Sequence, residues 1–405
     1  MNFNTFSFHP QINAGISNVG YNTATQIQSR AIPPILEGSD VLGLAQTGTG
    51  KTAAFVLPML QRLMKGQRRK LRALILAPTR ELAEQTHVAI KELGGRTGLR
   101  SISIYGGVSA NSQISRLRNG VDIVVACPGR LLDLKNQGAI DLRNIEILIL
   151  DEADHMFDMG FLPDVKRIIS AIPQKRQTLL FSATMPAKIH DLATKIMDHP
   201  VTIEIDITKP IDAIDHAIYP VNQVQKLDML LYLLDKHRSN QVLVFTRTKR
   251  RASKLAVQLS QAGVSSTSIQ GNLSQSKRRA AMNAFRKGKV KVLVATDIAA
   301  RGIDVMEVSH VINYDVPNTA EAYTHRTGRT GRMEQTGTAF SLVTQQDLSI
   351  VHSIERTLGK GLERRRVNGF ETILRESKKN NPVKKNSRMS RSRKQNRYRS
   401  SAKYH

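Results

Sequence analysis

Residues 145–154 read IEILILDEAD, an apolar run that ends in a cluster of carboxylates. The run has the length and composition of a buried strand, and the acidic side chains follow at its end. Residues 41–52 read VLGLAQTGTGKT, in which a second apolar strand leads into a glycine-rich loop and a Lys-Thr pair. Together the two stretches predict a phosphate cradle, a magnesium ligand and a carboxylate that addresses water. These are the minimum requirements for splitting a nucleoside triphosphate.

The glycine-rich loop resembles the Walker A pattern G-x-x-x-x-G-K-[ST], with Ala45 at its first position. Backbone N–H groups of such a loop, together with the N-terminus of the following helix, attract phosphate. We expect Lys51 to reach the β- and γ-phosphates and the Thr52 hydroxyl to ligate Mg²⁺. The residues expected to line the nucleotide are Ala45, Gln46, Thr47, Gly48, Thr49, Gly50, Lys51 and Thr52.

The two carboxylates after the second strand are expected to have different tasks. Asp151 would hold Mg²⁺, directly or through water, and Glu152 would orient and activate the attacking water. Such a pair is sufficient because phosphoryl transfer depends mainly on positioning and charge neutralisation.

Residues 325–332 read HRTGRTGR and place arginines at a spacing of three residues. On a helix or tight turn these arginines share one face. Guanidinium groups match phosphate oxygens well. Because this stretch belongs to a later part of the chain, we expect an arginine finger on a second domain and hydrolysis that requires the domains to close.

The composition indicates a polyanionic partner. The chain has 405 residues and a net charge of +27, which favours nucleic acid over an anionic membrane. No apolar run approaches the roughly 18 residues that a spanning helix needs. Residues 1–6 lack the pattern of a secretory signal, and Cys127 is the single cysteine, so we expect a cytoplasmic protein.

The chain is expected to be α/β, with two tandem domains built on parallel sheets. Short apolar runs alternate with helical patterns, as in βαβ units. The expected parts are residues 1–29 before the first domain, 30–206, a linker at 207–217, a second domain at 218–360 and a tail at 361–405. Residues 377–405 contain eleven Lys or Arg and no Asp or Glu, so we expect a disordered basic tail there.

Candidate strands follow the apolar runs. In the first domain they are 41–44, 73–77, 101–105, 123–126, 145–150, 178–182 and 201–205, and in the second 242–246, 266–269, 290–295, 310–313 and 338–343.

With these residues in place, the chain resembles a DEAD-box ATP-dependent RNA helicase of superfamily 2. The resemblance spans roughly residues 1–345, and the motifs occur in family order. Within the family, the short N-terminus and short basic tail resemble the bacterial RhlE-like branch. The resemblance implies two RecA-like domains that close around ATP and single-stranded RNA.

The resemblance assigns further roles residue by residue. It implies that Gln28 reads adenine, with Tyr21 and Phe3 as nearby aromatic residues, and that Asp304 lies at the ribose side of ATP. Arg329 and Arg332 match the finger positions and join Lys51, Asp151 and Glu152 as catalytic residues. The implied RNA contacts are Pro78, Thr79, Arg80, Gly107, Gly129, Arg130, Arg247, Gly271 and Thr296. The residues implied to couple hydrolysis to strand separation are Ser182, Thr184, Asp154, His325 and Arg326.

The chain departs from the family pattern at several positions. Two prolines of the adenine-reading element are replaced by Ala24 and Gln26. Cys127 stands where a threonine is usual and lacks its hydroxyl donor. Gln270 and Asn272 replace His and Asp of a second-domain RNA motif, which removes one charge.

We expect an RNA-dependent ATPase that separates short RNA duplexes locally or remodels RNA–protein complexes, with ATP and Mg²⁺. The expected partners are single-stranded and short duplex RNA, bound without sequence preference, and ribosomal-precursor or mRNA-decay assemblies. Two alternatives are a DNA-directed helicase or translocase, and an RNA chaperone or ribosome-assembly factor whose tail anneals strands while the ATPase times release.

Overall fold

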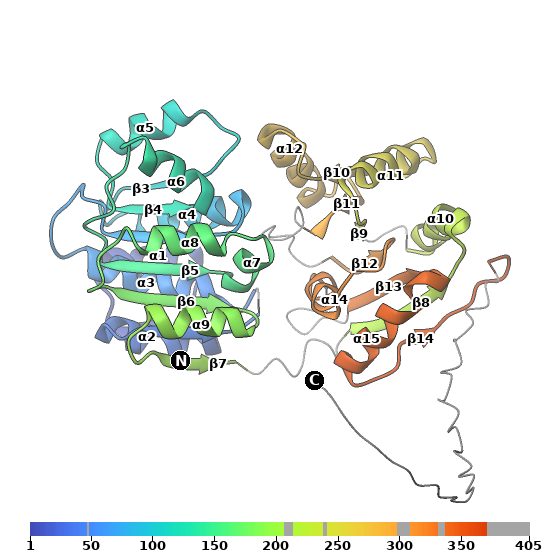
Figure 1. Cartoon of the computed structure of the whole chain (residues 1–405), viewed down its shortest axis with the longest axis horizontal. Coiled ribbons are helices and arrows are strands. Elements are labelled where there is room, and N and C mark those ends of the chain that lie inside the picture. Colours follow the sequence, from blue (N-terminus) through green and yellow to red (C-terminus); the bar gives the residue numbers. More distant parts are fainter. Residues whose placement is uncertain (47, 206–213, 238–240, 298–307, 331–336, 371–405) are drawn as a thin grey trace, which may run out of the picture.

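The computed structural model describes residues 1–46, 48–205, 214–237, 241–297, 308–330 and 337–370, which form two α/β domains in tandem (Figure 1). Each domain contains one seven-stranded sheet. Every pair of neighbouring strands that the structure describes in these sheets runs parallel. The expected α/β fold with two parallel sheets is therefore confirmed.

The first sheet belongs to the N-terminal domain. Its strands in spatial order are β3 (Ser101–Ile104), β4 (Ile123–Ala126), β2 (Ala73–Leu76), β5 (Ile147–Asp151), β6 (Gln177–Ser182), β1 (Val41–Leu44) and β7 (Val201–Glu204). Its helical elements are η1 (Phe3–Phe6), α1 (Pro10–Val19), α2 (Gln26–Glu37), α3 (Lys51–Leu63), α4 (Arg80–Gly94), α5 (Ala110–Arg118), α6 (Pro128–Asn136), α7 (Ala153–Asp158), α8 (Leu162–Ile169) and α9 (Ala187–Ile196).

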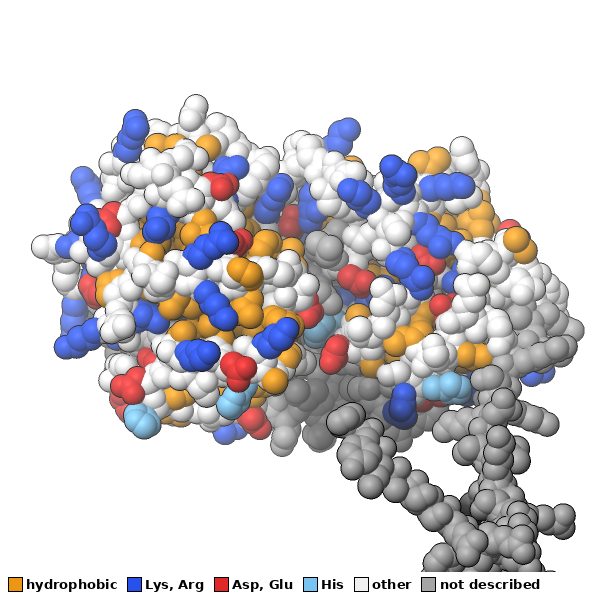
Figure 2. Space-filling view, in the orientation of Figure 1, with side chains coloured by type: hydrophobic (Ala, Val, Ile, Leu, Met, Phe, Trp, Pro, Cys, Tyr) orange, Lys and Arg blue, Asp and Glu red, His pale blue; other side chains and the backbone are white. Residues whose placement is uncertain are grey.

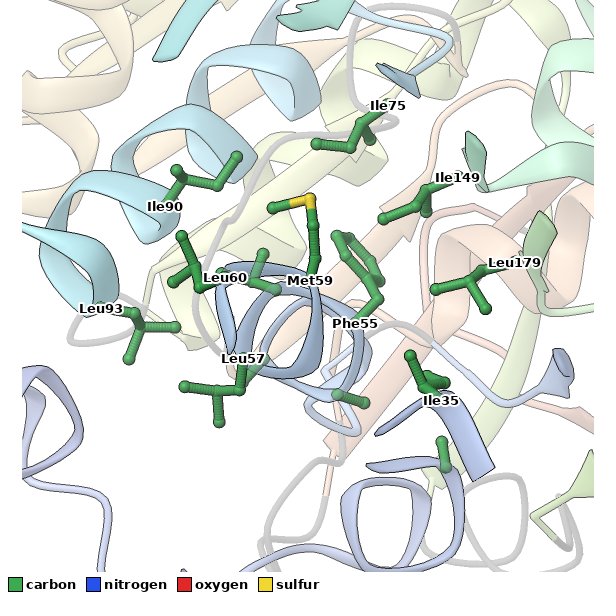
Figure 3. Packing of buried hydrophobic residues seen from close by; sticks show 14 of the residues in the cluster. Ile35, Phe55, Leu57, Met59, Leu60, Ile75, Ile90, Leu93, Ile149 and Leu179 are labelled. Carbon is green, nitrogen blue, oxygen red and sulfur yellow. The ribbon is translucent and has the colours of Figure 1, made fainter. Parts of the chain in front are cut away.

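This sheet is apolar on both faces because helices cover both. Neighbouring residues on one strand point to opposite cores, so that Ile75 joins the core under α1–α4 and Leu74 the core under α6–α9. In the first core, Phe55 and Met59 of α3 lie close to Ile149 on the sheet (Figure 3). This packing fixes the start of α3 relative to the ends of the strands.

The second sheet repeats the arrangement. Its strands in order are β10 (Ser266–Ile269), β11 (Val292–Ala295), β9 (Val242–Phe245), β12 (His310–Asn313), β13 (Gly337–Val343), β8 (Ile214–Pro220) and β14 (Glu363–Arg364). The accompanying helical elements are η2 (Gln223–Gln225), α10 (Lys226–Lys236), α11 (Lys249–Gln261), α12 (Gln275–Arg286), α14 (Ala320–Thr327), η3 (Gln345–Asp347) and α15 (Leu348–Leu358).

The carboxyl ends of the first sheet face the second domain. Figure 1 shows the arrowheads of β5 and β6 directed toward that domain. The loops after β1, β5 and β6 therefore meet at the inter-domain side of the sheet, where parallel sheets bind ligands.

Two strands lie where the sequence predicted none. β8 begins at Ile214, so residues 214–217 of the expected linker belong to the second sheet. β14 lies within the expected tail and pairs with β8. Charged and polar residues interrupt the apolar pattern of β8, and β14 is a two-residue edge strand of Glu and Arg, so neither has the apolar signal used to find strands. Residues 206–213 and the tail from 371 lie outside the described residues.

Residues 361–370 are packed against the second domain. Leu362 is 3% exposed in a core with Ile218. Arg365 bonds to Asp215 at 3.0 Å, and its guanidinium lies 5.8 Å from the centre of the Phe340 ring. This segment is thus part of the domain rather than of the tail.

A chain that stops after residue 360 is therefore expected to be less stable than one that stops after residue 370. Loss of buried Leu362 and of its neighbours removes about 3 kcal/mol from the free energy of unfolding of the second domain. Thermal and urea unfolding of the two truncated chains measures the difference. Equal stability of the two would show that the segment contributes nothing to the domain.

Candidate nucleotide and nucleic-acid site

The phosphate loop connects β1 to α3. Gly50 precedes the helix with a φ of 92°, in the left-handed region that favours glycine. Lys51 is buried, and its Nζ donates a hydrogen bond to the Ala45 carbonyl oxygen. Thr49 Oγ1 donates to the Gln46 carbonyl at 2.8 Å. The loop thus holds the N-terminus of α3 and a lysine ammonium at the end of β1, as an anion site requires.

Gln28 links the N-terminal segment to this loop. The Thr25 N–H donates to Gln28 Oε1 at 2.9 Å, and Gln28 Nε2 donates to the Gly50 carbonyl at 3.1 Å. A Cβ on Gly50 would lie 2.5 Å from that Nε2, so the contact also requires glycine. Because an amide oxygen accepts two hydrogen bonds and its nitrogen donates two, the side chain has capacity left for a base edge.

Two aromatic rings lie beside Gln28's helix. Phe3 and Tyr21 stack with ring centres 6.0 Å apart and an interplanar angle of 19°. Phe3 is only 2% exposed, whereas Tyr21 is 39% exposed. The two residues therefore form one aromatic unit in which Tyr21 has the accessible face.

The carboxylates lie at the end of β5. Asp151 is 2% exposed, and burial, reinforced by the adjacent charge of Glu152, raises its pKa to about 7 against the opposing charge of Lys51. Its ionised form is therefore under-compensated by the protein alone.

Glu152 has the opposite electrostatic balance. It is the residue directly before α7 and has a φ of 52°, in the left-handed region. Burial raises the pKa of this carboxyl, but a hydrogen bond and charge from His155, with the charges of Lys51 and Arg329, outweigh burial and hold the pKa well below its usual range. Glu152 is thus an anion near neutral pH, as a group that accepts hydrogen bonds from water must be.

Arg329 follows α14 of the second domain, and it is 7% exposed. Its charge lowers the pKa of Glu152 in the first domain. An arginine of the second domain therefore contributes to keeping a carboxylate of the first domain ionised.

Asp151 and Thr52 fit a magnesium ion. A buried carboxylate whose charge is under-compensated favours a divalent cation, and Mg²⁺ is usually held by one or two carboxylates together with substrate phosphates. Thr52 is the second residue of α3, so its hydroxyl lies at the same loop.

Asp154 ties the carboxylate motif to β6. Its Oδ2 accepts hydrogen bonds from Thr184 N at 2.9 Å and from Thr184 Oγ1 at 3.0 Å. Its own N–H donates to Ser182 Oγ at 3.2 Å. These bonds attach the segment after β6 to the start of α7.

Three neighbouring loops of the first domain form a cationic surface. A Cβ at Gly107 would lie 2.1 Å from Arg80 Nη1, so the guanidinium packs directly on the glycine backbone. Arg130 Nη1 donates to the Val108 carbonyl at 3.2 Å. Arg80 and Arg130 therefore converge on the loop after β3, while Pro78 is buried and Gly129 leaves open space beside them.

Capping differs between two of these loops. Thr79 caps α4 by accepting a hydrogen bond from Leu82 N at 3.2 Å. Cys127 precedes α6 and makes no side-chain cap, and burial raises the pKa of its thiol to about 12. Cys127 is therefore a neutral, largely enclosed side chain.

The second domain contributes loops after β9, β10 and β11. Arg247 N donates to Asp315 Oδ2 at 2.9 Å, and Thr296 follows β11 half-buried. Gln270 Oε1 accepts from Asn272 N at 2.6 Å, and Asn272 Oδ1 accepts from Lys249 at 2.9 Å. Gln270 and Asn272, which replace the His and Asp of the family pattern, thus form hydrogen bonds that stabilise the loop around Gly271.

An ion pair joins the domains. Arg278 Nε donates to Glu81 Oε1 at 2.8 Å, with the two side chains 10% and 14% exposed. Arg279 Nη2 donates to Tyr105 Oη at 3.1 Å. Glu81 follows Arg80 directly in the chain, so this ion pair lies next to the cationic surface.

Comparison with known proteins agrees with this geometry. Residues 25–192 match the DEAD/DEAH box helicase family, and residues 225–334 match the helicase conserved C-terminal domain. The RNA helicase CshA of Geobacillus kaustophilus is 40% identical over 365 residues, 89% of this chain and 78% of that protein. The chain belongs to the DEAD-box ATP-dependent RNA helicases.

Other members of this helicase family support the assignment. CshA of Bacillus subtilis is 40% identical over 363 residues, 89% of this chain and 73% of the relative. Saccharomyces cerevisiae Dbp5 bound to RNA and ADP BeF3 superposes with a TM-score of 0.80 at 34% identity, covering 90% of this chain and 95% of Dbp5. The fold is thus that of the family, and the RhlE-like branch stays a prediction.

Some predicted helicase residues need separate comment. Thr47, Asp304 and Arg332 lie outside the described residues. Arg326 is 2% exposed, donates to Asp297 Oδ2 at 2.8 Å and also bonds to Asn313 and Asp315, so its described contacts lie within the second domain. His325, on the same helix, is half-buried.

Sequence reasoning missed His155 as a partner of the catalytic machinery. Its Nδ1 lies 3.1 Å from Glu152 Oε2, and because Glu152 is ionised the imidazole donates that hydrogen bond. Both side chains are nearly enclosed, with exposures of 5% and 12%. The available signal was the three-residue spacing from Glu152 at the start of a helix, which brings side chains together.

His155→Ala is expected to lower kcat for ATP hydrolysis by about 10- to 100-fold, since a hydrogen bond to a charged group contributes about 1.5–3 kcal/mol. ATP affinity should be almost unchanged because His155 holds Glu152 rather than the phosphates. His155→Asn, which keeps a donor near Nδ1, should restore part of kcat. Steady-state kinetics with nucleotide binding measured separately checks this, and an unchanged kcat in His155→Ala would contradict it.

Proposed function

We propose that this helicase hydrolyses ATP at a site completed by the second domain and uses closure on single-stranded RNA to separate short duplexes locally. The observation that carries the proposal is the position of Arg329, which influences Glu152 across the domain boundary. The Glu81–Arg278 pair bridges the same boundary. Nucleotide chemistry and the RNA-facing loops therefore respond to one event, the closing of the domains.

Each residue of the site has a physical role in this reaction. Lys51 and the N-terminus of α3 hold the phosphates, and Glu152 orients the attacking water. Asp151 and Thr52 would hold Mg²⁺, which when bound neutralises phosphate charge and polarises the transferring group. Arg329 stabilises the charge of the transition state, a contribution worth roughly 10³–10⁵ in rate for an arginine finger.

RNA is held through its backbone. Arg80, Gly107 and Arg130 from the first domain and Arg247, Gly271 and Thr296 from the second present cations and open backbone at the inter-domain edge. Such groups contact phosphate and 2′-OH, so sequence preference should be slight. A single strand bent between two domains cannot stay in a duplex, and the partner strand would leave.

The domain arrangement favours this interpretation. The TM-score is 0.80 for Dbp5 bound to RNA and ADP BeF3, and 0.73 for a Dbp5 variant bound to Gle1 and IP6, over 90% and 91% of this chain. The arrangement is therefore more similar to the first form. Hydrolysis would reopen it through the Asp154–Thr184 contact.

The cellular setting is part of the proposal. We expect action in the cytoplasm on ribosomal-precursor or mRNA-decay assemblies, with the basic tail adding sequence-independent affinity. Among the described helices, none has the length and apolar character needed to cross a membrane.

RNA should stimulate the ATPase strongly, and DNA of the same sequence should stimulate it little, because the 2′-OH is among the groups recognised. Coupled ATPase assays, with unwinding of short duplexes, provide the measurement. Glu152→Gln should bind ATP and RNA but lose turnover, and Lys51→Ala should lose ATP binding.

Equal stimulation by DNA would favour the DNA-directed alternative. Strand annealing that survives Lys51→Ala, without ATP-dependent unwinding by the unaltered chain, would favour the RNA chaperone.

Arg278→Glu should raise the RNA concentration for half-maximal ATPase stimulation by about 30-fold or more, since removing one partner of an enclosed ion pair costs about 2–5 kcal/mol. The exchange Glu81→Arg with Arg278→Glu should recover much of the loss. Energy transfer between dyes on the two domains reports closure directly, and ATP binding without RNA is the control. A double variant no better than the single one would argue against the ion pair as a closing contact.

A further inference from the structure

The first domain carries a second cationic surface on the edge opposite the nucleotide site. Five of the segments that precede its seven strands are 64–72, 95–100, 116–122, which includes the last turn of α5, 137–146 and 170–176. In parallel sheets these helix-to-strand segments meet at the amino ends of the strands. Their exposed cations, here called the basic edge, are Lys65, Arg68, Arg69, Lys70, Arg96, Arg100, Arg116, Arg118, Arg143 and Lys175.

The backbone fixes the positions of these segments. The starts of β3, β4, β2, β5 and β6 are in register, because Ser101 pairs with Ile123, Ile123 with Ala73, Ala73 with Ile147 and Ile147 with Gln177. Neighbouring strands are about 4.8 Å apart, so the segments form a continuous row.

Asp122 binds two of the segments together. It is 1% exposed, and its carboxylate accepts hydrogen bonds from Arg69 N at 2.7 Å and Arg100 N at 2.8 Å. The Asp122 carboxylate thus bonds to backbone amides and not to the guanidinium groups of Arg69 and Arg100. Both arginine residues are exposed at the surface.

Two cavities open on this edge. One of about 510 Å³ is lined by Lys91, Arg100 and Arg116 and by no carboxylate. The other, of about 340 Å³, is lined by Lys70, Arg143 and Lys175 together with Arg72 and Glu146.

Little negative charge lies within the five segments of the basic edge. In the five segments, all of which the structure describes, Asp141 is the single exposed carboxylate, and it bonds to Arg143 at 2.9 Å. Glu146 bonds to Arg72 at 2.7 Å. Figure 2 shows Lys and Arg side chains gathered along the margin of the first domain that lies away from the second. A solvated surface without a partner would carry both signs of charge.

We propose that the basic edge binds the RNA backbone beyond the segment held between the domains. Strand β3 links the two surfaces, since Arg100 precedes its amino end and Gly107 follows its carboxyl end, and the seven residues from 101 to 107 span at most about 23 Å. Arg116 and Arg118 at the end of α5 lie along the same side of the domain. Arginine forks recognise phosphate without reading bases, so this surface would hold flanking RNA of any sequence.

Tethering would raise the local concentration of the flank near the cleft. Long RNA would therefore bind more tightly than a fragment that fills only the cleft, apart from the contribution of the tail.

The test is a triple variant, Lys70→Glu, Arg100→Glu and Arg116→Glu, in the full chain. The matched control changes the exposed lysines of α8 and α9, Lys166→Glu, Lys188→Glu and Lys195→Glu. Fluorescence anisotropy with a non-hydrolysable ATP analogue measures binding of single-stranded RNA of about 10 and about 40 nucleotides, of which the shorter is close to one site size.

The triple variant should bind the longer RNA about tenfold more weakly, bind the shorter one unchanged and keep ATPase stimulation by the shorter RNA. The slope of log affinity against log salt for the longer RNA should fall by about 2, since each phosphate contact on a single strand contributes about 0.7. The variant with glutamine at the same three positions should lose less affinity for the longer RNA. Its midpoint of thermal unfolding should equal that of the unaltered chain.

Equal loss for both RNA lengths, no loss for the longer RNA, or the same loss in the control would overturn the proposal. Loss of binding to vesicles of anionic lipid with unchanged RNA binding would overturn it in favour of a membrane surface. The comparison of lengths stands even if RNA failed to stimulate the ATPase, so the proposed function and this inference can fail separately.

Discussion

Two adjacent carboxylates enclosed at the end of β5 set the constraint on which the catalytic half of the molecule depends. Burial disfavours ionisation of both, and each charge opposes the other. The protein resolves this unequally: His155, Lys51 and Arg329 compensate Glu152, whereas Asp151 is left with a raised pKa. Glu152 is thereby kept as an anion that can accept a hydrogen bond from water. Asp151 lacks a sufficient positive partner in the protein and would be stabilised by a bound cation.

The same constraint involves the second domain. Part of the compensation for Glu152 comes from Arg329, whose position depends on Arg326 and its bonds to the ends of β11 and β12. Opening the domains would remove that charge from the site. The electrostatics of hydrolysis and the geometry of RNA binding are therefore parts of one conformational equilibrium.

The sequence predicted those parts of the structure that are encoded locally. The strand at 123–126 is a continuous apolar run, IVVA, and its bounds were predicted correctly. β14 was missed because two charged edge residues have no apolar period. Lys51 and the carboxylates were predicted because each motif is contiguous in the chain. The Glu81–Arg278 pair depends on how the two domains meet, which the sequence of either domain does not specify. The Glu152–His155 bond depends on the left-handed backbone conformation at Glu152, for which the sequence contains no direct signal.

The contact between Gln28 and Gly50 has a consequence for how the nucleotide is recognised. The Gln28 side-chain amide accepts a hydrogen bond from the Thr25 N–H and donates one to the Gly50 carbonyl that precedes α3. The binding free energies of the base and of the phosphates are then coupled, because one side chain takes part in both subsites. Because this amide keeps capacity for a base edge, a base that displaces Gln28 would also displace the Gly50 carbonyl, so a wrong base would slow the reaction in addition to binding less tightly itself.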